Sequence, residues 1–404
     1  MSQPLQETLS NLLENFKRGK LDYAKKIALS LTKDFPNHPF AWSILGGIYL
    51  QQNNYDLAIK TFKKYLELAP DDPHGYINLG NIYFQNNDLD NAQASFLKTL
   101  SLKSNDELAN YRMGQIMQKK GKYKEAEKKF KYIIEINPNS AEVLNSLGLA
   151  KKYLGNLNEA ITNFKEAIKI KPNYVDAYYN LANILYEIRH FDNAEIYYKK
   201  VLQLNSNHFY AYNNLGNVYN IQNEIKKAIL NYKKSILINK NFYLAYLNIA
   251  KAFIKVGLLD EAILNLNNTI KLDSKNYEAY NVLGNVCLKK RKYEQALDFY
   301  EKAIKINPNF KDAYNNKNFC LNFIYKLNLD LVYKEHMKFG SQFENKKDLE
   351  SPLYIKKTIH NKIKVGYVSA DFYEHSVSFF FEPLIKNHNK KNFEIFCYYN
   401  NNKF

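Results

Sequence analysis

Two side chains suited to acid–base chemistry stand close together near the C-terminal end of the chain, in the segment Asp371-Phe372-Tyr373-Glu374-His375. The imidazole of His375 can accept or donate a proton near neutral pH, and the carboxylate of Asp371 can orient it or cap a following helix. The segment follows a short apolar run over residues 363–368, and in parallel sheets chemistry gathers in the loops at the carboxyl ends of strands. On residue types alone, a histidine in a structural loop is the more common explanation.

A second set of polar side chains, here called the amide ladder, recurs in register along the chain. An amide presents both a donor and an acceptor, so a row of amides can pair with the backbone of an extended peptide while ignoring its side chains. Each hydrogen bond contributes only about 0.5 to 1.5 kcal/mol net, so useful affinity needs several at once. The sequence leaves a second interpretation open, in which abundant asparagine fills a polar face without a ligand. The ladder consists of Asn78, Asn180, Asn214, Asn248 and Asn316, and of Asn81, Asn183, Asn217 and Asn285 three residues further along.

The elements that must position these side chains repeat every 34 residues. A large side chain follows four positions after nearly every alanine of the repeat, and apolar residues spaced three and four apart predict two helices per unit. A residue of minimal bulk, such as Gly46 or Ala182, stands twelve positions before the alanine in eight copies. We expect one small residue to contact another where the two helices cross closely, and successive hairpins to stack into a quasi-linear solenoid. The repeated alanines are Ala24, Ala58, Ala92, Ala126, Ala160, Ala194, Ala228, Ala262 and Ala296.

Proline follows several of the predicted second helices, where its missing N–H and its ring stop helix propagation. The order of residues in each copy strongly resembles the tetratricopeptide-repeat family, whose signature has this length and the same Trp or Tyr, Leu, Gly, Tyr, Ala, Phe, Ala, Pro order. The resemblance covers about residues 5–310 and implies an all-α superhelix of about nine repeats plus capping helices. In the first copy Thr8 and Asn11 occupy expected core sites, which predicts a weak first helix.

The repeat pattern fails after Asn309. Tyr314 keeps its repeat position, but Lys317 and Asn318 replace the Leu-Gly pair. We expect residues 319–331 to continue as a helix that caps the stack, because a terminal unit has no neighbour on its outer face.

Beyond this cap the sequence predicts a linker and a new domain. Residues 331–343 have an amphipathic helical pattern, and residues 344–351 form a polar hinge. The expected organisation is therefore a repeat array over 5–310, a degenerate repeat with capping and linking helices over 311–350, and an incomplete α/β domain over 351–404.

Within the last domain the periodicity changes to that of a sheet. Apolar runs at residues 363–368 and 393–398 predict two strands, and a helix is expected over about 378–386, capped by Ser376 or Ser378. Strand, loop, helix and strand form the opening unit of a parallel sheet. A piece of this size cannot bury its own apolar faces.

The segment from Lys364 to Phe380 resembles the start of the catalytic region of the protein O-linked N-acetylglucosamine transferase family, including its bacterial SPINDLY-like members. Its sequence is Lys-Val-Gly-Tyr-Val-Ser-Ala-Asp-Phe-Tyr-Glu-His-Ser-Val-Ser-Phe-Phe. The preceding Tyr333-Lys-Glu-His-Met-Lys-Phe-Gly is similar to the linking helix of that family. The family transfers a sugar from a nucleotide sugar to Ser or Thr hydroxyls of proteins, with a catalytic region of two Rossmann-like lobes.

This resemblance implies roles for particular residues. His375 would be the histidine of the active-site loop beside the acceptor hydroxyl, and the amide ladder would bind the acceptor protein or peptide. The donor would be a nucleotide sugar, UDP-GlcNAc. Only about 44 residues after Ile359 match the catalytic region, and no glycine-rich phosphate loop is present. We therefore expect the N-terminal part of a glycosyltransferase, inactive by itself and without a cofactor of its own. The alternative is a repeat scaffold that binds proteins without catalysis.

Composition sets further limits on the function. The net charge of +17 invites binding to nucleic acid, but the lysines recur just after the second-helix aromatic, as at Lys131 and Lys165, where a hydrated outer face is expected. There is no apolar span for a membrane and no secretory signal, which predicts a cytoplasmic protein. Cys287, Cys320 and Cys397 suggest neither a disulfide framework nor a metal site. Nothing in the sequence specifies an oligomeric state.

Overall fold

The computed structural model describes residues 3–324, 329–343, 363–369, 386–387, 389–390 and 393–399. The chain divides into two compact units, Met1–Tyr333 and Lys334–Phe404. None of the described helices is both long enough and apolar enough to span a membrane.

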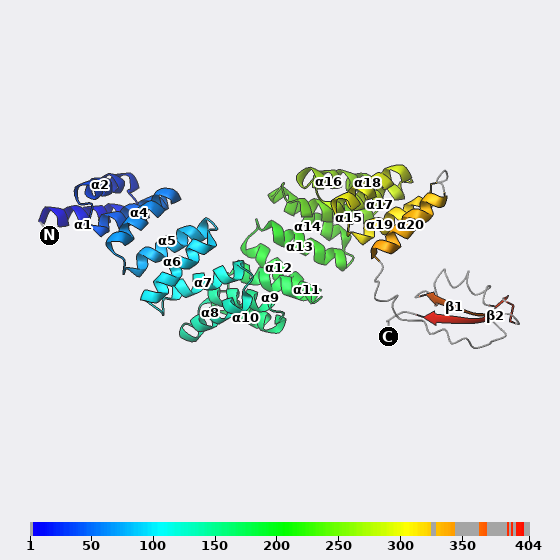
Figure 1. The fold of residues 1–404 in the computed structure, drawn as a ribbon, viewed down its shortest axis with the longest axis horizontal. Coiled ribbons are helices and arrows are strands. Elements are labelled where there is room, and N and C mark those ends of the chain that lie inside the picture. Colours follow the sequence, from blue (N-terminus) through cyan, green and yellow to red (C-terminus); the bar gives the residue numbers. More distant parts are fainter. Residues whose placement is uncertain are drawn as a thin grey trace. The chain divides into compact units, whose positions relative to one another are not determined.

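The first unit is a stack of antiparallel helical hairpins, coloured from blue to yellow in Figure 1. This confirms the all-α array predicted from the 34-residue period. The first helices of the hairpins are α1 (Gln3–Lys17), α3 (Pro39–Gln51), α5 (Pro73–Gln85), α7 (Glu107–Lys119), α9 (Ala141–Tyr153), α11 (Val175–Glu187), α13 (Phe209–Ile221), α15 (Tyr243–Lys255), α17 (Tyr277–Lys289) and α19 (Lys311–Leu321). The second helices are α2 (Leu21–Asp34), α4 (Tyr55–Leu68), α6 (Leu89–Leu102), α8 (Tyr123–Ile136), α10 (Leu157–Ile170), α12 (Phe191–Leu204), α14 (Ile225–Ile238), α16 (Leu259–Leu272) and α18 (Tyr293–Ile306).

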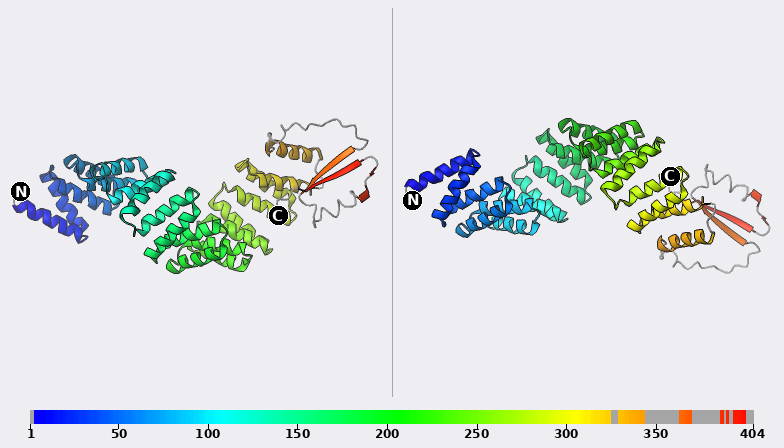
Figure 2. Two further views of the ribbon diagram at one scale, coloured as in Figure 1. Left: turned by 90° about the horizontal axis from the view of Figure 1, so that it is seen from below. Right: turned by 90° about the horizontal axis from the view of Figure 1, so that it is seen from above.

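The stack has two different faces. From α7 to α19, each first helix contacts the first helix of the next hairpin, whereas the second helices of the described array have no comparable contact with one another. The first helices therefore lie closer together and form the inner face of the stack, and the second helices form its outer face. Figure 2 shows the same succession of hairpins from two further sides.

The glycines that recur in the first helices pack against aromatic rings, so the predicted contact of one small residue with another is wrong. A Cβ atom on Gly284 would lie 2.4 Å from Cε1 of Tyr300, and one on Gly216 would lie 2.5 Å from Cε1 of Tyr232. Both rings are fully buried. Each glycine thus makes room for the large side chain of its own second helix, sixteen residues later, and the repeated alanines are buried separately, all with no exposed surface.

The turn inside each hairpin requires one left-handed residue. It recurs every 34 residues with φ between 56° and 82°. Glycine adopts this conformation without a steric penalty, whereas in any other residue the Cβ atom comes too close to the following carbonyl oxygen. The positions are Gly19, Asn53, Asn87, Gly121, Gly155, Arg189, Asn223, Gly257 and Arg291.

Replacing Arg291 with glycine is expected to stabilise the array. Arg291 has φ of 58°, and a residue with a Cβ atom in this left-handed conformation loses about 1 to 2 kcal/mol of stability. Glycine avoids this steric penalty but makes the unfolded chain more flexible, which lowers the free energy of unfolding by about 0.5 to 1 kcal/mol. We expect a net gain of roughly 0.5 to 1 kcal/mol in the free energy of unfolding, measured by urea titration followed by circular dichroism. Gly121→Ala is the reciprocal control, because a Cβ there meets no atom within 4 Å and only the backbone penalty remains. A loss of stability in Arg291→Gly would contradict this account.

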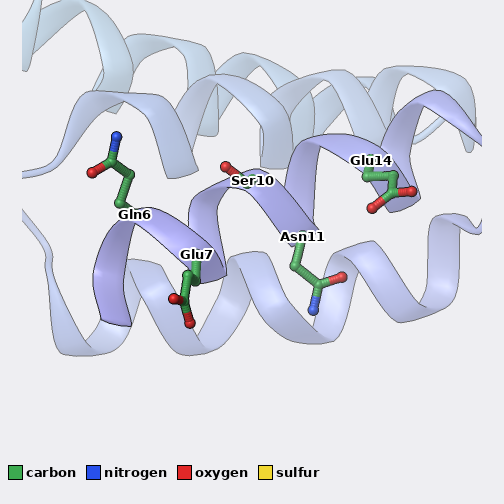
Figure 3. Close-up of a pocket in the computed structure, with 5 residues that line it drawn as sticks. All are labelled: Gln6, Glu7, Ser10, Asn11 and Glu14. Atoms are coloured by element: carbon green, nitrogen blue, oxygen red, sulfur yellow. The ribbon is translucent and has the colours of Figure 1, made fainter. Parts of the chain in front are cut away.

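The N-terminal hairpin presents a polar end face. Leu5, Leu9 and Phe16 of α1 pack against the core together with the buried Leu12, but Thr8 and Asn11 are exposed, so their expected core positions are wrong. The polar side chains of α1 on this face line a shallow depression of about 350 Å³ (Figure 3).

The C-terminal end of the array differs from the sequence prediction. The expected continuous helix over residues 319–331 is wrong, because α19 ends at Leu321 and the chain turns at Asn322, whose N–H reaches the carbonyl oxygens of Phe319 and Cys320. A further helix, α20 (Leu329–Phe343), follows. Its bounds confirm the predicted amphipathic helix.

The second unit contains two parallel strands, β1 (Ile363–Ser369) and β2 (Phe393–Tyr399), paired from Ile363↔Phe393 to Ser369↔Tyr399. This confirms the two strands and their parallel pairing. The helix expected over about 378–386 lies almost entirely outside the described residues.

Candidate functional site

The predicted catalytic residues follow strand β1 in the sequence. Asp371 and His375 lie outside the described residues; β1 ends at Ser369, two positions before Asp371. Their roles in acid–base chemistry stay predictions.

The amide ladder lies on the first helices and therefore on the inner face of the array. Its side chains are half-buried rather than fully exposed. They are distributed over six helices: Asn78 and Asn81 on α5, Asn180 and Asn183 on α11, Asn214 and Asn217 on α13, Asn248 on α15, Asn285 on α17 and Asn316 on α19.

One half of the ladder serves buried tyrosines. The hydroxyl of Tyr198 donates to Oδ1 of Asn183 at 2.7 Å, and the hydroxyl of Tyr232 donates to Oδ1 of Asn217 at 2.8 Å. Tyr300 and Asn285 form the same pair at 2.8 Å. Burial raises the pKa of all three tyrosines, so each hydroxyl stays protonated and needs an acceptor. These three asparagines therefore have a structural role whether or not a ligand binds.

The other half of the ladder joins neighbouring hairpins. The amide nitrogen of Asn180 donates to Oδ1 of Asn145 at 3.0 Å, and Asn248 donates to Asn213 at 2.9 Å. The pair Asn316 and Asn281 repeats this contact at 3.0 Å. The acceptors, all buried, were missed by sequence reasoning, although an asparagine recurs every 68 residues at 145, 213 and 281.

Asn214 connects the two halves. Its Nδ2 donates to Oδ1 of Asn183 at 3.0 Å and to the hydroxyl of Tyr179 at 3.1 Å. Its Oδ1 accepts from Nδ2 of Asn213 at 3.2 Å. The result is a continuous network through α11, α13 and α15, which fixes the orientation of the amides along this face.

In several amides of the ladder, the internal hydrogen bonds use only one of the two polar side-chain atoms. No hydrogen bond among the described residues involves Oδ1 of Asn180 or Asn248, or Nδ2 of Asn217. The same holds for both polar atoms of Asn78, whereas Asn81 accepts from Nε of Arg112 at 3.0 Å. The inner face thus offers oriented acceptors and donors side by side, as the backbone of an extended peptide requires.

Replacing Asn217 with leucine is expected to lower the free energy of unfolding by about 1 to 3 kcal/mol, because the hydroxyl of Tyr232 loses its acceptor. The double variant Asn217→Leu with Tyr232→Phe should recover most of this loss. The chain itself contains that apolar combination, since Leu149 and Phe164 occupy the equivalent positions. Urea unfolding of both variants measures the effect, and equal stability of the single and double variants would contradict the pairing.

His208 caps the helix that carries Asn213, Asn214 and Asn217. Its Nδ1 accepts from the N–H of Ala211 at 3.1 Å, and its ring lies 4.7 Å from that of Tyr179. Nδ1 can accept only while the imidazole is neutral. Burial, the largest cause, lowers the pKa of His208 from its ordinary value of 6.5.

The array is therefore expected to lose stability below about pH 6.5. In that range the unfolded chain binds a proton at His208 and the folded chain does not, so the free energy of unfolding falls until the pH reaches the lowered pKa of the folded state. Thermal unfolding at pH 7.5 and pH 5.5 measures this loss. His208→Asn keeps a capping acceptor that does not titrate and should lose less stability between the two pH values; an unchanged pH dependence would contradict the role of His208.

The lysines and cysteines that the sequence analysis singled out lie in contrasting surroundings. Lys131 and Lys165 are exposed on second helices, as predicted. Cys287 and Cys320 are buried, and burial raises the pKa of both thiols, that of Cys320 to about 11. The described residues contain no group of three or more His, Cys, Asp or Glu side chains that could hold a metal ion.

Comparisons with known proteins agree with this architecture. Profiles described as TPR repeat match residues 46–87 and 150–188, and profiles described as tetratricopeptide repeat match residues 73–106, 107–140, 175–208, 197–229 and 277–310. A profile described as glycosyl transferase family 41 matches residues 342–402. No curated protein matches the chain.

Several solved structures are similar to part of this chain. MamA is 30% identical, with 40% of this chain and 95% of MamA covered and a TM-score of 0.38. YrrB, described as a TPR protein with an unusual peptide-binding site, is 22% identical over 46% of this chain and 97% of YrrB, with a TM-score of 0.40. A tetratricopeptide repeat protein from Parabacteroides merdae is 15% identical over 62% of this chain and 99% of that protein, with a TM-score of 0.49.

Proposed function

We propose that this tetratricopeptide-repeat chain is the N-terminal part of a protein glycosyltransferase similar to the O-linked N-acetylglucosamine transferases. The observation that carries the proposal is the match of residues 342–402 to glycosyl transferase family 41, directly after a repeat array. The two parallel strands that the structure describes in this segment are compatible with the opening of an α/β lobe.

In this proposal the array holds the acceptor protein. The inner face carries oriented amides with unused donors and acceptors over α11, α13 and α15, a span of three hairpins. A polypeptide in extended conformation presents N–H and C=O groups along its length, so several weak bonds can form at once without selecting side chains. This suits an enzyme that modifies many different proteins.

The chemistry belongs to the segment after β1. His375 would lie beside the acceptor hydroxyl of Ser or Thr and Asp371 would orient its imidazole, while UDP-GlcNAc would supply the sugar. These assignments rest on the resemblance of the segment Lys364–Phe380 to the family. The location expected for such a protein is the cytoplasm.

The test is sugar transfer by the longest natural protein that contains this chain. UDP-GlcNAc labelled in the sugar would be incubated with that protein and a Ser-containing acceptor, and transfer would be followed by mass spectrometry. His375→Ala should abolish transfer without changing the circular dichroism spectrum. Sugar transfer by His375→Ala at an undiminished rate would contradict the role of His375. If the wild-type protein transferred no sugar to any protein of a cell extract, the proposed glycosyltransferase activity would be wrong.

A repeat scaffold without catalysis is the second candidate, favoured by the fact that the whole amide network lies within the first unit. It predicts that the chain binds peptides but not the nucleotide sugar. Substituting Asn180, Asn214 and Asn248 together by alanine should weaken peptide binding under either proposal. Alanine at Asn163 and Asn265 on second helices, whose amides bond only to their own helix, provides the control. Binding of UDP-GlcNAc by the natural protein would exclude the scaffold.

A further inference from the structure

A pocket of about 450 Å³ opens on the first helices α15, α17 and α19, at the C-terminal end of the array. Its apolar lining comes from Ile254, Val282, Leu288 and Phe319. Phe319 is 55% exposed, although a phenyl ring is among the side chains that gain most from burial. The network of Asn214 does not reach this region, so the pocket is a feature additional to the amide contacts described above.

The charge at the edge of the pocket is positive. Lys251 and Lys289 both line it. The ammonium of Lys251 is paired with the carboxylate of Glu278 on the neighbouring helix. Lys289 is exposed, and among the described residues no carboxylate forms an ion pair with it. A bound ligand with one negative charge could therefore form an ion pair with Lys289 at the edge of the pocket.

Two amides of the ladder also line the pocket. Asn285 accepts from Tyr300 through Oδ1 and Asn316 donates to Asn281 through Nδ2, which leaves a donor on Asn285 and an acceptor on Asn316. These are the two groups that a peptide unit needs on either side. The pocket therefore combines backbone recognition with an apolar lining and one lysine, Lys289, that forms no ion pair with a described carboxylate.

We propose that this pocket selects the sequence of the bound polypeptide. It takes the apolar side chain of an extended segment, with Lys289 binding an aspartate or glutamate two positions away. Side chains at positions i and i+2 of an extended chain point to the same side, so both can face this surface at once. The proposal rests on the proposed function of the inner face as a binding site for extended polypeptides, and adds a preference for acidic and apolar residues to it.

The probes are fluorescein-labelled twelve-residue peptides that contain Phe-Ser-Glu, Phe-Ser-Gln or Ala-Ser-Glu in an otherwise identical Gly-Ser sequence. Their affinities for the full chain would be measured by fluorescence anisotropy at low salt. We expect the Phe-Ser-Glu peptide to bind about threefold to fivefold more tightly than the Phe-Ser-Gln peptide, the range of a solvated ion pair. Its advantage over Ala-Ser-Glu should be about tenfold, from burial of the ring.

Substitutions connect these preferences to the pocket. Lys289→Gln should remove the preference for Glu over Gln, and Phe319→Ala should reduce the preference for Phe over Ala. Lys305→Gln is the control, because Lys305 lies on the second helix α18 of the same hairpin and is exposed. Circular dichroism would verify that each variant is folded.

The outcomes separate this inference from the function on which it rests. If the three peptides bind equally, or if Lys289→Gln and Lys305→Gln behave alike, the pocket does not select sequence, while the inner face remains a peptide-binding site. If none of the peptides binds to the wild-type chain, both proposals are overturned.

Discussion

Replacing Gly284 with valine is expected to lower the free energy of unfolding of the C-terminal hairpins by about 3 kcal/mol or more. A Cβ atom at this position would lie 2.4 Å from Cε1 and 2.6 Å from Cδ1 of Tyr300. The Tyr300 ring is completely buried and its hydroxyl is held by Asn285, so it has no room to retreat. Overpacking of a closed core costs about 1 to 3 kcal/mol, occasionally more, and valine adds two methyl groups beyond the clashing Cβ.

Two glycine variants calibrate this expectation. Gly284→Ala should cost less, because Ala182 stands at the equivalent position opposite Tyr198 in another hairpin, and the array accommodates one methyl group there. Gly340→Val provides a control on helix propensity, since a Cβ at Gly340 of α20 meets no atom within 4 Å. Hydrogen exchange of α17 and α18 amides, with urea unfolding, measures the loss. Similar effects of valine at 284 and 340 would show that steric conflict with Tyr300 is not the cause.

Replacing Lys151 with methionine is expected to lower the free energy of unfolding by about 2 to 3 kcal/mol. Lys151 on α9 is only 5% exposed, and its ammonium binds Glu127 on α8 at 2.7 Å and Glu159 on α10 at 2.6 Å. Removing one member of a buried ion pair costs about 3 to 5 kcal/mol, because the other charge is left without compensation. We expect less here, since Glu127 keeps a second partner, Lys131, at 2.8 Å.

Lys131 supplies a matched control for this prediction. It binds the same carboxylate but is exposed, so Lys131→Met should cost no more than about 1 kcal/mol. The double variant Lys151→Met with Glu127→Gln should recover part of the loss. The three variants would be compared by urea unfolding at pH 7, and equal costs for Lys151→Met and Lys131→Met would refute the importance of burial.

The pH dependence of this ion pair has a definite sign. The hydrogen bond from Lys131, the largest cause, and that from Lys151 lower the pKa of Glu127 from 4.5, whereas the hydrogen bond to Glu127 raises the pKa of Lys151 from 10.5. The stabilisation from Glu127 is therefore lost only as the pH falls below about 4.5. That from Lys151 is lost only as the pH rises above about 10.5. Between these limits neither group changes its charge, so the loss of stability expected below about pH 6.5 is assigned to His208.

Much of the fold could be predicted from the sequence because it depends on the regular spacing of residues that are close together in the chain. Apolar residues three and four apart specify each helix, and a 34-residue period specifies the hairpin and its stacking. The left-handed turn residues recur with the same period, from Gly19 to Arg291, and were overlooked because asparagine and arginine stand at positions where glycine is the usual signal. The end of α19 was misplaced since residues 319–331 lack a strong stop signal such as proline.

The candidate site could be located from the sequence but not interpreted. Register alone placed the amide ladder on one face, yet it did not show that Asn217 accepts from Tyr232, or that Asn248 is bound to Asn213. The first pair depends on how two helices cross within a hairpin. The second depends on the offset between neighbouring hairpins, which brings residues 35 positions apart into hydrogen-bonding distance.

By itself, then, the sequence determined the helices, their pairing into repeats and the type of chemistry available on each face, because those properties follow from residues close together in the chain. Only the tertiary structure decided which polar atoms are used internally and which stay available to a ligand. The same holds for the glycines, which prove to accommodate buried rings such as Tyr300 rather than small partners. The physical reason is that hydrogen bonds and steric contacts are set at ångström scale by the stacking of whole helices, which a residue period does not record.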